Sequence, residues 1–267
     1  MTGVQTCALP ISYAWVYGDN LSYNFGQQPF SYTPPTGFKA LNTQNLPTPT
    51  ISNGATVMAA TTYTGTGSSL TIANTVNGVS FKPDFVWVKG RSGTTSHNLS
   101  DSVRGTASTL FSNTTGAENA SSQRINGFSS TGFSVGTDTD VNTSSATYVG
   151  WQWQAGQGTT SSNTSGSITS TVSVNATAGF SIVTFTGSTG AYTLGHGLGV
   201  APSMIIYKDR QAVSNNWVVL HSGLSNMTSQ FLILNSTAAV GTLGTTVSAP
   251  TSTTMGCSTR SEEHTSE

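Results

Sequence analysis

The sequence contains very little charge. Only 7% of its 267 residues are Asp, Glu, Lys or Arg, against about 25% in an average soluble domain. Nine Lys and Arg offset ten Asp and Glu, which gives a formal net charge of −1, and the basic residues are scattered singly. A nucleic-acid partner requires a basic patch whose binding releases counterions. We therefore expect no nucleic-acid partner.

Cysteine and long apolar runs are also scarce. Cys7 and Cys257 are the two cysteines, and their distant positions match no metal-binding or redox motif. No apolar run approaches the roughly 20 residues that a membrane helix requires. We expect no membrane insertion, no metal and no cofactor.

Aromatic residues and glycine are well represented. The chain has five Trp, eight Tyr, eleven Phe and 29 Gly, enough aromatic volume to fill a core. Residues 148–155 alternate along the chain, as in a strand. We expect one face of that segment to line the core, namely Val149, Trp151, Trp153 and Ala155. Helical periodicity is missing, so the sequence predicts an all-β fold built from tandem antiparallel β-sandwich domains.

Three sequence blocks occur twice in the same order. Pro83 and Lys89 recur as Pro202 and Lys208, both 119 positions later. Self-similarity of this kind indicates repeated units. We assign the first repeat to residues 47–157, a Gly/Ser/Thr linker to 158–164, and the second repeat to 165–259.

The alignment of the repeats predicts matching core positions. Phe85 and Met204 should be buried alike, as should Val86 and Ile205. Gly136 aligns with Gly256, so the counterpart of the strand at residues 148–155 would begin near position 268. We expect the second repeat to lack that strand and to self-associate through the edge left open.

Both ends of the chain resemble translated sequencing adapters. The residues that carry this resemblance are Met1–Ile11 and Arg260–Glu267. Such segments are excluded from fold reasoning.

Residues 12–46 resemble the closing segment of a SPRY domain, which is a β-sandwich. The matching stretches are Asn24–Phe30 and Pro35–Phe38. The repeats resemble a domain of unassigned function found beside SPRY domains in marine bacteriophage structural proteins. The residues that carry the second resemblance are Phe81–Arg91, His97–Gly105, Ala146–Gly156 and Gly195–Pro202.

These resemblances imply a virion component of the tail or fibre type, located outside the cell and contacting other virion proteins. They supply no catalytic residues, and we expect no enzyme. The expected role is structural, with a contribution to recognition of the host surface. The alternative is a carbohydrate-binding, lectin-like module of a secreted bacterial protein.

Glycines surround His196 at positions 195, 197 and 199. A phosphate-binding glycine loop opens a helix, whereas this one precedes a predicted strand, so we favour a turn. His196 as a metal ligand is the alternative, although it has no histidine counterpart in the first repeat.

Acidic residues offer two further candidate sites. Asp138, Asp140 and Asn142 alternate like the opening of a calcium loop, but the loop lacks its required Gly and Glu, which favours a hairpin turn. A glycoside hydrolase requires two carboxylates flanking a cleft. Asp84 with Asp101 or Glu118 would supply them, but nothing in the sequence brings them together.

Tryptophan supplies the remaining candidates. Four tryptophans, Trp87, Trp151, Trp153 and Trp217, have the flat faces that stack on sugar rings. Trp87 and Trp217 form, with His196, our candidate ligand-binding set, with a host-surface glycan as the ligand. The competing interpretation is a core role, because Trp87 aligns with Ile206 and a position that accepts Ile is usually buried.

Overall fold

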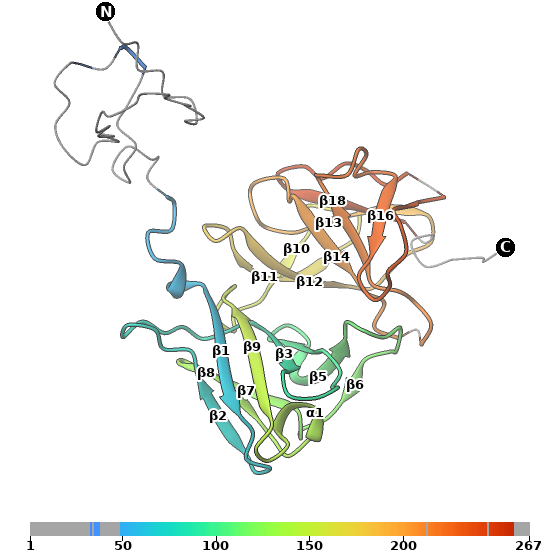
Figure 1. The fold of residues 1–267 in the computed structure, drawn as a ribbon. Helices are drawn as coiled ribbons and strands as arrows, with labels where there is room; N and C mark the ends of the chain where they lie inside the picture. The colour runs from blue at the N-terminus through green and yellow to red at the C-terminus, as the bar shows by residue number, and fades with distance from the viewer. Residues whose placement is uncertain (1–32, 34, 38–48, 212, 245, 259–267) are drawn as a thin grey trace, which may run out of the picture. The chain divides into compact units, whose positions relative to one another are not determined.

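The chain divides into two compact units, Met1–Ser52 and Asn53–Glu267. The computed structural model describes residues 33, 35–37, 49–211, 213–244 and 246–258. Both adapter-like ends, and all but four residues of the SPRY-like segment, lie outside the described residues. The fold described below is therefore that of the second unit (Figure 1).

The described elements are almost all strands, which confirms the all-β class. The exceptions are a short 3₁₀ turn, Gly54–Thr56, and one short helix, α1 (Thr139–Asn142). The strands of the first repeat are β1 (Met58–Thr64), β2 (Leu70–Ala73), β3 (Phe85–Gly90), β4 (Asn98–Asp101), β5 (Gly105–Phe111), β6 (Asn119–Ala120), β7 (Ile125–Ser129), β8 (Gly132–Val135) and β9 (Thr147–Trp153).

The second repeat contains the remaining strands. They are β10 (Ser161–Asn163), β11 (Ser170–Asn175), β12 (Phe180–Phe185), β13 (Ala191–Gly195), β14 (Met204–Tyr207), β15 (Val218–His221), β16 (Gln230–Ile233), β17 (Gly241–Thr242) and β18 (Thr254–Ser258). Residues 158–164, which the composition predicts as a linker, include β10, and β10 pairs with β11.

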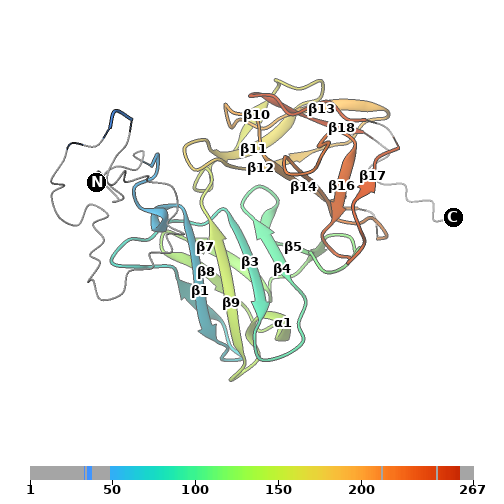
Figure 2. The same ribbon diagram turned by 45° about the horizontal axis from the view of Figure 1, so that its top comes forward.

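The first repeat packs two antiparallel sheets over one core. One sheet has the order β1-β9-β3-β4-β5-β6 and the other β2-β8-β7, and Figure 2 shows β1, β9 and β3 side by side in the larger sheet. Val86 and Val88 of β3 and Phe133 and Val135 of β8 are fully buried in one cluster. Alternate residues of each strand therefore fill the space between the sheets.

Strand β9 turns the opposite face inward from the one that its sequence predicts. Its buried residues are Tyr148, Gly150 and Gln152. Three of the four side chains that we expected in the core are half-buried on the outer face, namely Val149, Trp151 and Trp153. The fourth, Ala155, lies after the end of β9 and is buried as expected. The expectation for these three residues is wrong.

Two features of the core explain why this face of β9 points inward. One is the space at Gly150, and the other is the hydrogen bonding of Gln152. A Cβ on Gly150 would lie 2.7 Å from Cζ of Phe133, so this ring occupies the space of a side chain. The buried amide of Gln152 is satisfied, because Nε2 donates to Oγ1 of Thr61 (3.1 Å) and Oε1 accepts from Nδ2 of Asn74 (3.2 Å). A buried polar group that finds its partners is compatible with a core.

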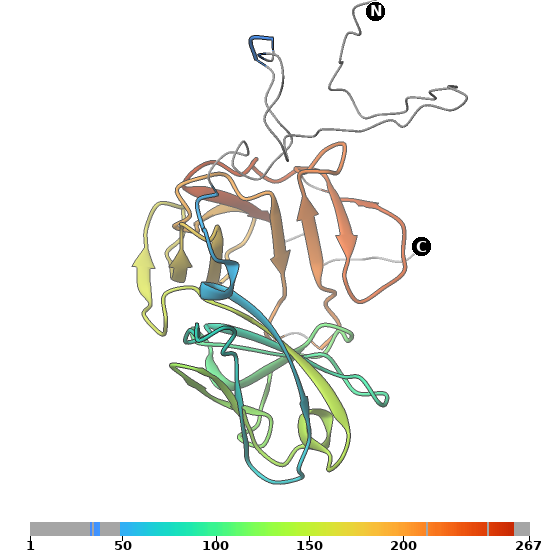
Figure 3. The ribbon, with the colours of Figure 1, turned by 60° about the vertical axis from the view of Figure 1, so that its left-hand side comes forward.

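The second repeat arranges its strands as three sheets. Their orders are β10-β11-β12, β13-β18 and β14-β15-β16-β17. Figure 3 shows the orange strands of the last sheet running side by side. Leu194, Ile205, Phe231 and Met255 are among the buried residues of its core.

Two groups of strands pair in the same way in both repeats. The pairing of Ile72 with Phe133 corresponds to that of Leu194 with Met255, and β3-β4-β5-β6 corresponds to β14-β15-β16-β17. Met255 is thus the counterpart of Phe133, which makes Ser134, rather than Gly136, the counterpart of Gly256. The sequence alignment is wrong here by two residues, a shift that keeps every side chain on its face.

Burial follows this correspondence at one of the two tested positions. Val86 (0% exposed) and Ile205 (7%) are both buried, as the alignment predicts, but Met204 is 57% exposed whereas Phe85 is half-buried. In the first repeat, Trp153 of β9 lies beside Phe85. No described strand pairs with β14 on the corresponding side.

Candidate functional site

The outer face of the larger sheet carries four large aromatic side chains. This aromatic face consists of Phe85 and Trp87 of β3 and Trp151 and Trp153 of β9. The residues pair directly across the strands, with ring centroids 5.4 Å apart for Phe85 and Trp153 and 6.2 Å apart for Trp87 and Trp151. All four are half-buried, so each ring is partly covered.

The second repeat supplies much of that cover. Phe180 of β12 lies parallel to Trp153, with ring centroids 6.2 Å apart. Trp217, only 5% exposed, packs against Leu99 and Leu110 of the first repeat, and its Nε1 donates to the carbonyl oxygen of Phe111 (2.9 Å). The aromatic face is therefore part of the junction between the repeats.

Trp87 donates through Nε1 to Nδ1 of His97 (3.0 Å). Because Nδ1 accepts, the proton of the neutral ring lies on Nε2. Burial, followed by the charge of Lys89, lowers the pKa of His97, which favours this neutral form.

His97 and Trp217 occupy equivalent positions. The backbone N–H of His97 donates to Oδ1 of Asn113, and that of Trp217 donates to Oδ1 of Asn235. The two tryptophans of our candidate set thus come from different positions of the repeat, yet the structure brings both into one cluster with Leu99 and Leu110.

A charged network lies at the same junction. Glu118 of the first repeat accepts from Nη1 of Arg104 (2.8 Å) and from Nη2 of Arg210 (2.7 Å), while Arg104 also pairs with Asp101. Burial alone raises the pKa of Glu118, but hydrogen bonds and charges from Arg210 and Arg104 outweigh it and lower the pKa. The hydrogen bond with Glu118 raises the pKa of Arg210.

Lys208 also connects the two repeats through hydrogen bonds. Its ammonium donates to the carbonyl oxygens of Thr115 (3.1 Å), Asp209 (2.9 Å) and Asn215 (3.0 Å). The acceptor on Thr115 belongs to the first repeat, whereas the other two belong to the second.

Asp84 is fully buried and holds the turn that follows β9. Its Oδ2 accepts from the backbone N–H groups of Ala155 and Gln157, both at 2.7 Å. Its Oδ1 accepts from the N–H of Gly158 (2.6 Å) and from Oγ of Ser102 (2.7 Å). The carboxylate therefore fixes the path by which the chain leaves the first repeat.

The contacts of Asp84, Asp101 and Glu118 can be compared with what a glycoside hydrolase requires of its two carboxylates. A general acid needs a carboxyl group with a raised pKa, whereas the pKa of Glu118 is lowered. Asp101 is engaged by Arg104, and Asp84 by backbone donors. The three carboxylates thus serve internal contacts.

His196 follows β13 in the second repeat and is not part of the cluster that contains Trp87 and Trp217. It is 1% exposed; its Nδ1 accepts from the N–H of Leu198 and its Nε2 donates to the carbonyl oxygen of Thr251, each at 3.2 Å. Burial lowers its pKa, against the effect of the Thr251 carbonyl. Both ring nitrogens thus have protein partners, and binding of a ligand at His196 stays a prediction.

The glycines around His196 lie in an irregular loop between two strands, in keeping with the connecting role that we expected. Residues 196–203 connect β13 to β14, and Gly197 and Gly199 both have φ of +75°, a conformation that favours glycine. The loop leads into a strand, as the turn interpretation requires.

The segment around Asp138 is a helical turn, so the hairpin interpretation is wrong. Asp138 caps α1, its Oδ1 accepting from the N–H of Asp140 (2.9 Å). The side chain of Asn142 bonds backbone groups of Thr66, Ser68 and Gly136. The bond at Asp138 caps the helical turn locally, whereas the bonds of Asn142 also connect it to residues 66 and 68.

No described group of three or more His, Cys, Asp or Glu residues has an arrangement that would hold a metal ion. Within the same part of the chain, no helix is long and apolar enough to cross a membrane.

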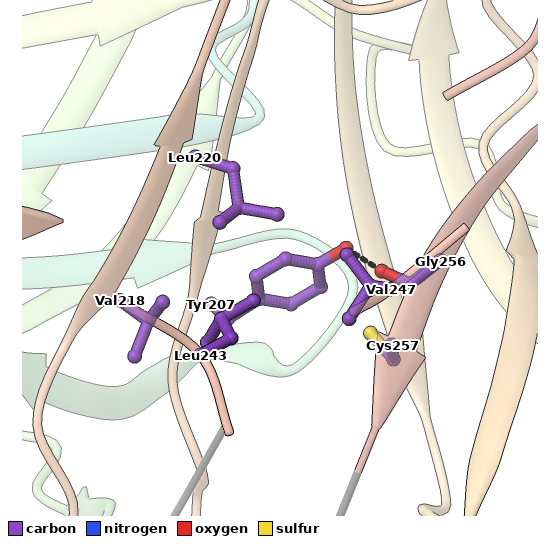
Figure 4. Close-up of a pocket in the computed structure, with 7 residues that line it drawn as sticks. All are labelled: Tyr207, Val218, Leu220, Leu243, Val247, Gly256 and Cys257. Atoms are coloured by element: carbon purple, nitrogen blue, oxygen red, sulfur yellow. Dashed lines mark hydrogen bonds between the residues drawn. The ribbon is translucent and has the colours of Figure 1, made fainter. Parts of the chain in front are cut away.

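A small cavity lies in the core of the second repeat (Figure 4). Its volume is about 10 Å³, which is the size of about one water-sized sphere. The hydroxyl of Tyr207 donates to the carbonyl oxygen of Gly256 (2.9 Å) beside it. The lining residues are Tyr207, Val218, Leu220, Leu243, Val247, Gly256 and Cys257. This space is a packing gap, too small for an organic ligand.

Sequence reasoning missed most of the junction. The pairing of Glu118 with Arg210 joins residues 92 positions apart, and no local pattern signals it. One signal was present: Gly150 stands between Tyr148 and Trp151 in a strand, and a glycine inside a strand marks a close approach by another group.

Comparison with known proteins places the chain in a family. The model of the family described as "Domain of unknown function (DUF7483)" matches residues 53–267, which include the second repeat and all but the first six residues of the first. No curated protein and no solved structure matches the chain. Because the match covers most of the chain, this protein belongs to the DUF7483 family.

Proposed function

We propose that this chain is part of a structural protein of a bacteriophage virion, of the tail or fibre type. The observation that carries the proposal is the junction, where Trp217, Phe180 and the Glu118–Arg210 pair join two β-sandwich repeats in series. Rigid connections between repeated modules keep each module at a defined position in an extended assembly. The role is non-enzymatic, its location is the outside of the virion, and its partners are other virion proteins.

The engagement of the charged residues supports a structural role. Glu118 and Lys208 both bind across the junction, and Asp84 holds the connecting turn. A fibre-type protein also presents repeated modules to repeated surface ligands, which increases avidity. Recognition of the host surface is accordingly part of the proposal.

Immunogold electron microscopy tests this proposal. Antibodies against residues 53–258 are applied to purified virus-like particles from the material that encodes the chain, with antibodies pre-absorbed on the pure protein as the control. Gold on the tails of particles is the expected result. Gold confined to cell envelopes, with bare particles, would overturn the proposal.

A second candidate is carbohydrate binding by a lectin-like module. The observation that favours it is the outward position of Trp151 and Trp87 on the aromatic face, because a partly exposed indole has a flat face for stacking on a sugar ring. The cover by Phe180 and Trp217 limits that face to its uncovered part.

A glycan array distinguishes this candidate from a purely structural role. The second candidate predicts that Trp151→Ala abolishes binding to a glycan that the unchanged protein retains, and that Trp151→Phe keeps most of it. Equal signals for both variants, with equal thermal stability, would reject the aromatic face as the sugar site.

A further inference from the structure

Three asparagines of the chain are each followed by glycine, namely Asn53, Asn77 and Asn126. In such a pair, the backbone nitrogen of the glycine can attack the side-chain carbonyl carbon of the asparagine, because glycine has no Cβ to shield its nitrogen. The attack closes a succinimide ring. All three asparagines are exposed, so access to water does not distinguish them, and their hydrogen bonds must be compared.

Asn77 and Gly78 form the tip of a two-residue hairpin. The N–H of Val76 donates to the carbonyl oxygen of Val79 (2.8 Å), and the N–H of Val79 donates to that of Val76 (2.9 Å). Between them, φ is +50° at Asn77 and +78° at Gly78. Positive φ at both central residues is the signature of a type I′ turn.

The peptide group between Asn77 and Gly78 is held by neither of its sides. In the described part of the chain, neither the N–H of Gly78 nor the carboxamide of Asn77 has a hydrogen-bond partner. A Cβ placed on Gly78 would meet nothing within 4 Å, so water and hydroxide reach this nitrogen.

Rotation of the same peptide group converts a type I′ turn to type II′, in which only the first central residue keeps a positive φ. Glycine accepts either sign of φ without steric cost. The nitrogen of Gly78 can therefore turn toward Cγ of Asn77 while Val76 and Val79 stay paired.

The side chain of Asn126 is fixed by two hydrogen bonds. Its Nδ2 donates to the carbonyl oxygen of Ser122 (3.1 Å), and its Oδ1 accepts from Oγ of Ser134 (2.7 Å). The following Gly127 lies in β7, where a Cβ would be 2.6 Å from Oγ of Ser134. The pair is thus held in a strand and crowded by the neighbouring one.

The side chain of Asn53 is also engaged, at the start of the 3₁₀ turn. Its Oδ1 accepts from the N–H of Ala55 (3.0 Å). This bond directs the carboxamide to the residue after Gly54. Asn77 is therefore the asparagine of the three whose carboxamide has no described partner to release before it reacts.

We propose that Asn77 is a site of spontaneous covalent modification, at which the folded chain deamidates to aspartate and isoaspartate. Hydroxide removes the proton of the Gly78 nitrogen, which then forms a bond to Cγ of Asn77. The bond from Cγ to Nδ2 breaks, and ammonia leaves after taking a proton from water. A water molecule then opens the succinimide at either carbonyl, which leaves one new carboxylate and, in isoaspartate, an extra methylene in the backbone of the turn. This inference is independent of the proposed function.

Peptide mapping by mass spectrometry tests the proposal. The purified full chain is incubated at mildly alkaline pH, and electron-transfer fragmentation identifies aspartate and isoaspartate at each asparagine. Asn77 should deamidate at least about tenfold faster than Asn53 and Asn126, and its rate should rise with pH because hydroxide removes the reacting proton. The same chain in denaturant is the control, in which the three rates should become similar.

Ser134→Ala provides a matched variant, because it removes the donor to Oδ1 of Asn126. Deamidation at Asn126 should become faster in this variant, while the rate at Asn77 should stay unchanged. Equal rates at the three asparagines of the folded chain would overturn the proposal. So would an Asn77 that stays intact in the folded chain but reacts in denaturant.

Discussion

At the residue scale, the contribution of a side chain to stability depends on which face of its strand it points to. Ile205 and Met204 are neighbours in β14, yet Ile205 is 7% exposed and Met204 57% exposed. Both are large and apolar, so their sequence does not distinguish them. The distinction depends on which face of the strand has a neighbour.

We predict that Ile205→Ala lowers the free energy of unfolding by about 2–5 kcal/mol, because it leaves a cavity in the core. Met204→Ala, the matched control, should change it by about 0.5 kcal/mol or less, as surface substitutions usually do. Urea unfolding followed by tryptophan fluorescence measures both. Equal losses would show that the two faces of β14 are covered alike.

At the element scale, a single carboxylate holds the segment that follows β9. Asp84 accepts three backbone N–H groups from residues 155–158 in addition to a hydroxyl. A buried charge stays compatible with folding when hydrogen bonds replace its lost hydration. The turn therefore depends on a residue 71 positions earlier in the chain.

We predict that Asp84→Asn speeds amide exchange at Ala155, Gln157 and Gly158, because the amide nitrogen would face N–H donors and leave some of them unpaired. The free energy of unfolding should fall by about 1–3 kcal/mol. Asp140→Asn is the control, since Asp140 is half-buried at the start of α1. Unchanged exchange at 155–158 in Asp84→Asn would contradict this account of the turn.

At the scale of the whole second unit, ion pairs and aromatic contacts join the repeats. The folded-state pKa of Glu118 lies below its ordinary value of 4.5. A carboxyl group with a depressed folded-state pKa stabilises the fold at pH values above its unfolded pKa. That contribution disappears as the pH falls through the folded pKa.

We predict that Glu118→Gln lowers the free energy of unfolding by about 1–3 kcal/mol at pH 7, through the loss of charge-assisted hydrogen bonds. The difference from the unchanged protein should shrink as the pH falls below 4.5, because the native carboxyl group then becomes neutral as well. Denaturant unfolding from pH 7 to pH 3 measures it. A difference that stays constant over this range would exclude charge as the cause.

Trp217 provides the apolar part of the same junction. We predict that Trp217→Ala costs about 3–5 kcal/mol, and that it couples to Leu110→Ala by about 0.5–3 kcal/mol in a double-mutant cycle, since the two residues share a cluster. Phe133→Leu lies in a separate core cluster, so its effect should add to that of Trp217→Ala within about 0.5 kcal/mol. Additivity in both cycles would mean that Trp217 stabilises only its own repeat.

The sequence by itself determined the class of fold and the repetition. Low charge, scattered glycines and β-forming runs predicted an all-β chain, and the recurring Pro83–Lys89 block identified strands that the structure pairs in the same way. These features are local, because a strand's propensity and its turns depend on neighbouring residues. The strand-connecting loop around His196 was predictable for the same reason.

Only the tertiary structure decided which face each strand buries and what the tryptophans contact. Residues 148–155 alternate, but both of their faces carry side chains suited to a core, and the ring of Phe133 against Gly150 selects one. Likewise, Trp217 meets Leu110, and Arg210 meets Glu118, across about a hundred residues of chain. Alternation fixes the period of a strand but not its phase, and the phase depends on packing partners that are distant in the sequence.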